Sequence, residues 1–187
     1  VFGDTIPHFS YKTDIVINPD LNDFYFNGVD FQVIKIHGHS PYQVGYITPD
    51  NVAYLGDVLL SEKRIRLTKL PYIFDVGNDL ASKKNLKTLE CDKYILSHEG
   101  VYDKIDRLID KNIDHINSRI EILLDILKHP KCFEDYTVDI VNKLEINADL
   151  RKIVYLQRTI RGYLSYFQEN NLVDAYLDNN KILFAKK

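Results

Sequence analysis

Gly38-His39-Ser40-Pro41 decides the fold, together with two shorter stretches, Leu55-Gly56-Asp57 and Leu96-Ser97-His98-Glu99-Gly100. In each stretch, a side chain that can bind a metal lies near glycine and directly after a predicted strand. A histidine, an aspartate and a second histidine spaced this widely can meet only through folding, as ligands of hydrolytic metal centres commonly do. We therefore treat His39, Asp57 and His98 as one candidate metal site.

The sequence around the first two stretches predicts a β-sheet. Runs of β-branched and aromatic residues indicate strands over residues 13–17, 23–26, 31–36, 44–48 and 52–55. Asn27-Gly28 and Pro49-Asp50-Asn51 are typical of turns that close β-hairpins. The second hairpin would bring His39 and Asp57 to one edge of the sheet. Both faces of these strands carry apolar residues, as in sheets that pack in layers.

The third stretch should reach the same edge by a crossover. A helix is expected over residues 79–89 and a strand over 93–96, which would deliver His98 beside the other two candidates. Asp75 and Asp79 are candidates to cap this helix.

Residues 103–187 predict a second, mainly helical domain after a first domain over residues 1–102. Apolar residues at helical spacing indicate helices over 105–127, 133–144 and 150–168, and the first of these should end at His129-Pro130. Two short strands, over 173–177 and 182–185, should pair around Asp178-Asn179-Asn180 as a wing-like hairpin.

Composition excludes several function classes. The chain has 187 residues, 45% of them hydrophobic, and a formal net charge of −3, which gives no whole-chain case for binding nucleic acid or a membrane. Its apolar runs are too short to span a bilayer. Cys91 and Cys132 lie far apart, which argues against a disulfide framework or a zinc knuckle and favours a cytoplasmic location. Because the chain starts at Val1 and contains no methionine, we expect a preceding segment.

The three stretches together resemble the C-terminal half of the metallo-β-lactamase-fold hydrolases, most closely the glyoxalase-II-like and ribonuclease-like branches. The resemblance covers residues 12–102. It implies an α/β fold, namely the C-terminal half of an αββα sandwich. It also implies that His39 completes a first metal site, that Asp57 bridges two metals and that His98 binds the second. The expected cofactor is Zn²⁺, two ions per complete site, with Fe or Mn as alternatives.

The resemblance further implies that a metal-bound hydroxide attacks an ester, a thioester or a phosphodiester, with Asp57 as the catalytic residue. This chain departs from the family pattern, however, because it contains no H-x-H-x-D-H motif. His37 stands where proline is usual, Tyr42 where glycine is usual, and Glu99 follows His98 directly. We therefore expect half of a two-metal site, in a chain that is inactive alone.

By the order of its elements, the C-terminal domain resembles a winged-helix-like extension. It could shape the substrate site, form a homodimer or bind nucleic acid, RNA included. Basic and aromatic residues of the last long helix could follow a phosphate backbone: Arg151, Lys152, Tyr155, Arg158, Arg161 and Tyr163. The alternative is a solvated face opposite an apolar stripe. We expect His37 either behind the candidate ligands or at the surface, and His115 and His129 at the surface or at helix ends.

Overall fold

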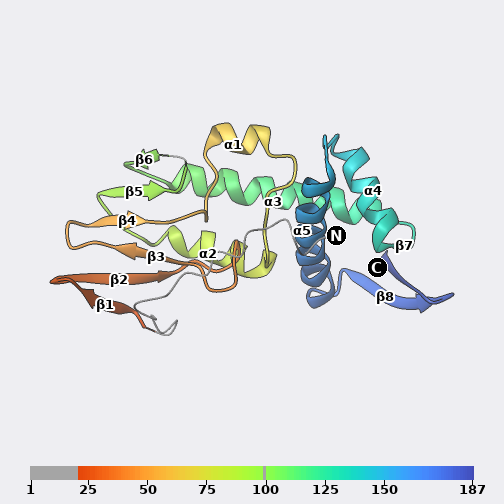
Figure 1. Ribbon diagram of the computed structural model, residues 1–187, viewed down its shortest axis with the longest axis horizontal. Helices are drawn as coiled ribbons and strands as arrows, with labels where there is room; N and C mark the ends of the chain where they lie inside the picture. Colours follow the sequence, from red (N-terminus) through yellow and green to blue (C-terminus); the bar gives the residue numbers. More distant parts are fainter. Residues whose placement is uncertain (1–20, 99) are drawn as a thin grey trace.

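The computed structural model describes residues 21–98 and 100–187. They form a mixed α/β fold, with a six-stranded sheet and its covering helices at one end and a helical module with a small sheet at the other (Figure 1). The strand predicted over residues 13–17 lies outside the described residues. No helix in the described part of the chain is both long enough and apolar enough to cross a membrane.

The main sheet has the spatial order β1-β2-β3-β4-β5-β6. Its strands are β1 (Asp23–Phe26), β2 (Val29–Lys35), β3 (Val44–Ile47), β4 (Val52–Tyr54), β5 (Lys93–Leu96) and β6 (Gly100–Tyr102). Neighbouring strands are antiparallel except β4 and β5, which are parallel and joined by a crossover. This crossover brings the end of β5 to the same edge as the end of β4.

Both predicted hairpins are confirmed. Asn27 and Gly28 join β1 to β2 with φ values of 50° and 82°, and Asn51 joins β3 to β4 with φ 57°. Asparagine and glycine adopt this left-handed region at little cost, which is why these residue types mark the turns.

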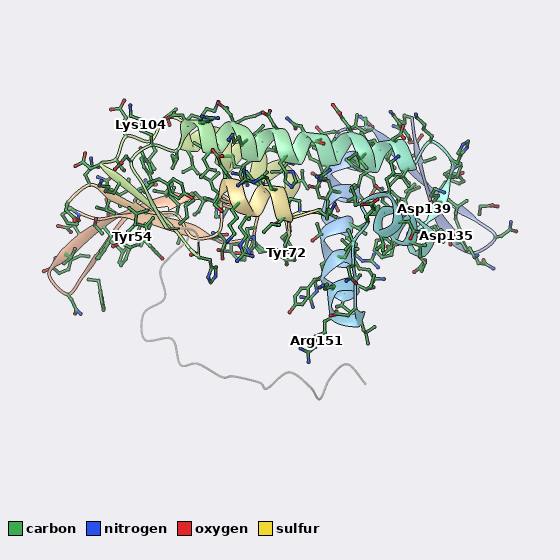
Figure 2. The ribbon with its side chains drawn as sticks, turned by 90° about the horizontal axis from the view of Figure 1, so that it is seen from above. Tyr54, Tyr72, Lys104, Asp135, Asp139 and Arg151 are labelled. Carbon is green, nitrogen blue, oxygen red and sulfur yellow. The ribbon has the colours of Figure 1, made fainter. Side chains whose placement is uncertain are left out.

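Helices α1 (Glu62–Leu67), α2 (Val76–Leu86) and α3 (Asp106–Ile126) lie on one side of the main sheet (Figure 2). The core beneath them is built from apolar residues of the strands, of the turns after them, of α2 and of α3: Ile36, Ala53, Leu55, Val58, Leu59, Leu86, Tyr94, Leu96, Ile105, Leu108 and Ile109.

The opposite face of the main sheet is apolar as well. Cross-strand pairing places one row of side chains on that face: Phe24, Phe31, Val33, Tyr46, Tyr54, Ile95 and Val101. Tyr54 is 45% exposed and Val101 63% exposed. No helix among residues 21–98 and 100–187 covers this face (Figure 2). A sheet with two apolar faces normally packs between two layers.

The C-terminal module contains the predicted helices and hairpin. Its elements are β7 (Lys131–Cys132), α4 (Phe133–Lys143), α5 (Leu150–Glu169), β8 (Val173–Asp178) and β9 (Lys181–Lys186), and its sheet has the order β7-β9-β8. Helix α3 joins the two cores, since Leu108 packs in the sheet core and Leu123 in the helical one. The winged-helix description and the domain boundary at residues 102 and 103 stay predictions.

Candidate functional site

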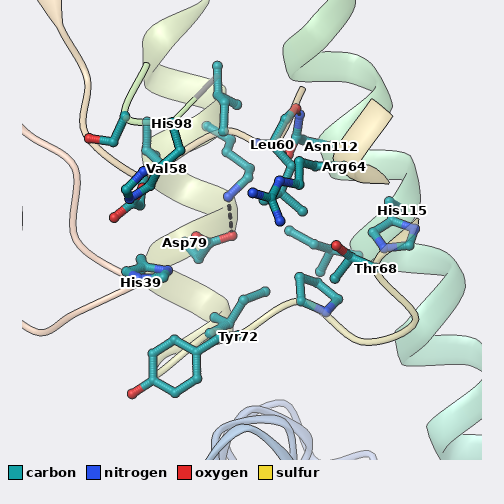
Figure 3. A pocket seen from close by; sticks show the side chains of 17 residues that line it. His39, Val58, Leu60, Arg64, Thr68, Tyr72, Asp79, His98, Asn112 and His115 are labelled. Atoms are coloured by element: carbon teal, nitrogen blue, oxygen red, sulfur yellow. Dashed lines mark hydrogen bonds and ion pairs between the residues drawn. The ribbon is translucent and has the colours of Figure 1, made fainter. Parts of the chain in front are cut away.

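The three side chains predicted from the sequence line one cavity of about 310 Å³. His39 follows β2, Asp57 follows β4 and His98 follows β5, so all three lie shortly after the ends of main-sheet strands. Figure 3 shows His39 and His98 on the cavity wall. Their convergence is therefore a property of the fold. Whether they bind a metal stays a prediction.

The described residues do not complete a metal site. Among residues 21–98 and 100–187, no three His, Cys, Asp or Glu side chains are gathered closely enough to hold a metal ion. Asp57 and His98 are exposed and His39 is half-buried. The donor types suit zinc, but the donor set present here falls short of one ion's needs.

The His39 loop lies directly on the backbone around the start of α2. Gly38 has φ +132°, and a β-carbon on it would be 2.3 Å from the Cα of Asp79. The Gly38 carbonyl accepts hydrogen bonds from the amides of Phe74 (2.9 Å) and Asp75 (3.0 Å). The Ser82 hydroxyl donates to the carbonyl of His37 at 2.7 Å. Glycine is thus required at position 38 both by its conformation and by this contact.

Two backbone hydrogen bonds hold the Asp57 and His98 turns together. The Leu55 amide donates to the Ile95 carbonyl at 2.8 Å, and the Ser97 amide donates to the Gly56 carbonyl at 3.0 Å. His98 itself has φ +64°. This left-handed conformation is costly for a residue with a side chain, and such strain is commonly found at functional sites.

A buried ion pair at the cavity was not predicted from the sequence. The Lys83 ammonium donates to the Asp79 carboxylate at 2.5 Å, and the two residues are only 4% and 1% exposed. Burial raises the pKa of Asp79, opposed by the charges of Lys83 and His39. Burial likewise lowers the pKa of Lys83, opposed by Asp79. The one available signal was the four-residue spacing, typical of ion pairs along a helix.

The two predicted caps of α2 have different outcomes. Asp75 is the N-cap, because its carboxylate accepts a hydrogen bond from the amide of Asn78 at 2.9 Å. The prediction of Asp79 as a cap is wrong, since this residue lies inside the helix. The helix accordingly starts at Val76 and ends at Leu86, three residues earlier at each end than expected.

The outer wall of the cavity comes from α1 and α3. Helix α1 starts at the N-cap Ser61 and carries Arg64 into the cavity lining (Figure 3). The buried Asn112 of α3 fixes the segment before α1. Its side-chain amide accepts from the Leu60 amide at 2.9 Å and donates to the Leu60 carbonyl at 2.9 Å. These two hydrogen bonds fix the backbone just before α1, the helix that carries Arg64.

His115, predicted at the surface, is half-buried and lines the cavity. Burial lowers its pKa, the neighbouring Arg119 lowers it further, and a hydrogen bond with the Thr68 backbone opposes both. Its Nε2 is buried without a hydrogen-bond partner. The prediction of a surface or helix-end position is therefore wrong, because His115 lies in the middle of α3 and lines the cavity.

Comparison with solved structures shows the fold. The chain is similar to a metallo-β-lactamase family protein from Thermus thermophilus, at 16% identity and a TM-score of 0.66, over 88% of this chain and 52% of the other. It is also similar to a β-lactamase domain protein from Burkholderia ambifaria, at 15% identity and a TM-score of 0.74, over 98% and 54%. No family model matches the sequence, and no curated protein matches it.

The chain therefore has the metallo-β-lactamase fold, as the three sequence stretches predicted. It spans about half the length of each of these two structures. At identities this low, the likeness establishes the fold alone. Activity, metal and substrate are inferred from the site.

Proposed function

We propose that this chain supplies part of the active site of a metal-dependent hydrolase. The observation that supports the proposal is the convergence of His39, Asp57 and His98 on one cavity of a metallo-β-lactamase fold. Imidazole and carboxylate groups together are typical zinc ligands, and Fe or Mn would also accept them.

The remaining ligands must then come from outside the described residues. Two observations support this. The chain spans about half of each matched structure, and one face of its main sheet is apolar yet uncovered by any described helix. A second layer on that face would carry further side chains to the exposed Asp57 and His98. Without it, we expect the 187-residue chain to be inactive.

The wall of the cavity indicates how substrate would be handled. A bound divalent ion would lower the pKa of water and polarise an ester, a thioester or a phosphodiester. In the proposal, His39 and His98 are ligands and Asp57 is the bridging carboxylate. Arg64 brings positive charge to the wall, whereas the charge of Lys83 is matched by its partner Asp79. Fixed charge of this sign stabilises negative charge that develops during hydrolysis.

Hydrolysis assays test the proposal. The longest natural protein that carries this chain should hydrolyse one of three probes: p-nitrophenyl acetate, an acyl-thioester, or bis(p-nitrophenyl) phosphate. A chelator should abolish the activity and added Zn²⁺ should restore it. The 187-residue chain alone should show none. Turnover by this chain that persists in chelator would contradict the metal hypothesis.

A nucleic-acid-binding role without chemistry is the competing hypothesis from the sequence. The same assays separate the two, because a pure binding module would turn over none of the three probes. The sequence also suggested Tyr163 for a nucleic-acid-binding face. This residue is fully buried in the helical core and cannot contact a ligand at the surface. Arg158 and Arg161, in contrast, are exposed on α5.

A further inference from the structure

A second hollow adjoins the candidate site. It has a volume of about 470 Å³ and lies between α5 and the segment over residues 72–75. Aromatic and guanidinium side chains stand among its lining: Tyr72, Phe74, Arg158, Arg161 and Tyr166. We call it the α5 groove.

Tyr72 is a wall shared by the α5 groove and the His39 cavity. It lines both, and its ring meets the His39 imidazole edge-on, with 5.1 Å between the ring centroids. Figure 3 shows the tyrosine projecting beside His39 at the mouth of the cavity. An extended ligand seated at His39 would therefore continue past Tyr72 into the groove.

The groove is fixed firmly relative to the cavity. On one side, the Gly38 carbonyl accepts from the amides of Phe74 and Asp75. On the other, Gly162 lets α5 approach the same segment, because a β-carbon there would be 2.7 Å from the Phe74 carbonyl oxygen. Residues 72–75 are thus held between the His39 loop and α5. Such a fixed arrangement presents a ligand to the site at a defined distance.

The groove offers phosphate binders beside stacking surfaces. Arg158 and Arg161 lie one turn apart on α5, and the Arg161 guanidinium is 4.0 Å from the centroid of the Phe133 ring. That stacking holds the side chain in place while its N–H groups can still reach a phosphate. Tyr72 and Phe74 are 36% and 53% exposed. Exposed aromatic rings beside arginine are typical of surfaces that bind single-stranded nucleic acid.

Two acidic residues also line the groove, and neither stands beside the arginines along the chain. The Asp75 carboxylate caps α2 by accepting from the Asn78 amide at 2.9 Å. Glu169 lies eight residues after Arg161, about two turns further along α5. Tyr72 also borders Lys152 and Tyr155 in an adjoining hollow. The groove lining therefore holds two arginines and two carboxylates, and one of the carboxylates, Asp75, is engaged as a helix cap.

We propose that the α5 groove binds a single-stranded nucleic acid, with a phosphate at Arg158 and Arg161 and a base against Tyr72 and Phe74. The strand would continue past Tyr72 and place a phosphodiester in the His39 cavity. This inference rests on the proposed function and narrows its substrates to phosphodiesters. The groove would then set the substrate class, while the cavity would do the chemistry.

Binding can be tested without hydrolysis, so the two proposals can fail separately. A fluorescein-labelled oligouridylate of about twelve nucleotides is titrated in EDTA with the longest natural protein that carries this chain, and its anisotropy is followed. Arg158→Ala/Arg161→Ala should weaken binding by at least about tenfold at moderate salt. The slope of log K against log salt should fall by about 1.4, or about 0.7 for each lost contact. Tyr72→Leu should weaken binding by about fivefold or more.

Two control variants separate a specific loss of binding from a general effect of removing charge or from misfolding. Arg107→Ala removes an exposed arginine from the first turn of α3 and should change affinity less than twofold. Arg158→Ala alone leaves the Arg161 guanidinium stacked on the Phe133 ring. A loss of binding in this single variant therefore cannot come from disruption of that stack. Absence of binding by the unmodified protein would overturn the inference. So would equal affinities for the unmodified protein and folded Arg158→Ala/Arg161→Ala, or tighter binding of a duplex than of the single strand.

Discussion

Gly38 and Asp79 are in backbone contact, and this contact joins the His39 loop to α2. A β-carbon on Gly38 would be 2.3 Å from the Cα of Asp79. Neither side can move easily, because the Gly38 carbonyl is held by the amides of Phe74 and Asp75. The position of His39 at the cavity therefore depends on a residue with no side chain.

Gly38→Ala should accordingly destabilise the fold. We expect a loss of roughly 2–4 kcal/mol in the free energy of unfolding, from the left-handed φ together with the clash. Gly28→Ala is the matched control, since Gly28 also has positive φ but its β-carbon would meet only the Tyr25 hydroxyl at 3.8 Å. Urea unfolding of both variants measures the difference. Equal losses would mean that the contact with α2 contributes nothing.

The buried pair of Asp79 and Lys83 should show strong coupling. Asp79→Asn leaves an ammonium buried without a counter-charge, which should cost about 3–5 kcal/mol. Lys83→Met should also cost stability, because it leaves the Asp79 carboxylate buried without its partner. The double variant should be more stable than the sum of the single losses predicts.

A double-mutant cycle by urea unfolding measures this coupling. The exposed pair of Asp125, near the end of α3, and Lys128, just after that helix, is the control, and its removal should change stability little. Additive losses at Asp79 and Lys83 would show that the two charges act independently.

His115 should make stability depend on pH. Burial is the main reason that its pKa in the folded chain is lowered from the ordinary value of 6.5. The unfolded chain then binds more protons than the folded chain, so stability falls as pH drops below about 6.5 toward the lowered pKa. His115→Gln should remove this part of the pH dependence. Unfolding free energies of both proteins between about pH 7.5 and about pH 5 test it, and identical slopes would contradict it.

The strands and hairpins could be predicted because their signals are local. Asn27-Gly28 and Asn51 adopt the positive φ that their residue types favour, and the runs beside them form β1 to β4. The meeting of His39, Asp57 and His98 at one cavity could be predicted too, as each lies a few residues after a strand and near a glycine. The order of strands in the sheet then brings them to one edge. Their role as metal ligands stays a prediction.

The rest of the cavity could not be predicted, because it depends on contacts between segments that are distant in the sequence. The sequence suggests a cap at Asp79, because nothing in it shows that Gly38 lies against this residue. Helix α1 was not predicted, although Ser61 before Glu62 is a good start signal, since a helix this short carries little periodicity. Neither Arg64 nor Tyr72 could be assigned to the cavity before the crossover and the 72–75 segment were placed.

Gly162→Ala should disturb the α5 groove from the helix side. The new β-carbon would be 2.7 Å from the Phe74 carbonyl oxygen, so α5 or residues 72–75 must shift. We expect a loss of about 1–3 kcal/mol, despite the higher helix propensity of alanine. Ser165→Ala, at an exposed position of the same helix, should be nearly neutral. Thermal unfolding compares the two, and a stabilised Gly162→Ala would show that this close approach is absent.

Asp57, proposed for the chemistry, and Arg158, proposed for binding, should differ in which substrates their replacement affects. In the longest natural protein that carries this chain, Asp57→Asn should lower phosphodiester hydrolysis by at least about 100-fold, because the proposal makes Asp57 the carboxylate that bridges the metals. Arg158→Ala should mainly raise KM for an oligonucleotide, since the groove lies beyond the His39 cavity. For bis(p-nitrophenyl) phosphate, which is too small to reach α5, Arg158→Ala should leave kcat/KM unchanged.

The measurements are initial rates on both substrates, with far-UV circular dichroism to confirm that each variant is folded. If Arg158→Ala lost as much activity on the small diester as Asp57→Asn, the groove and the cavity would not have the separate roles proposed for them.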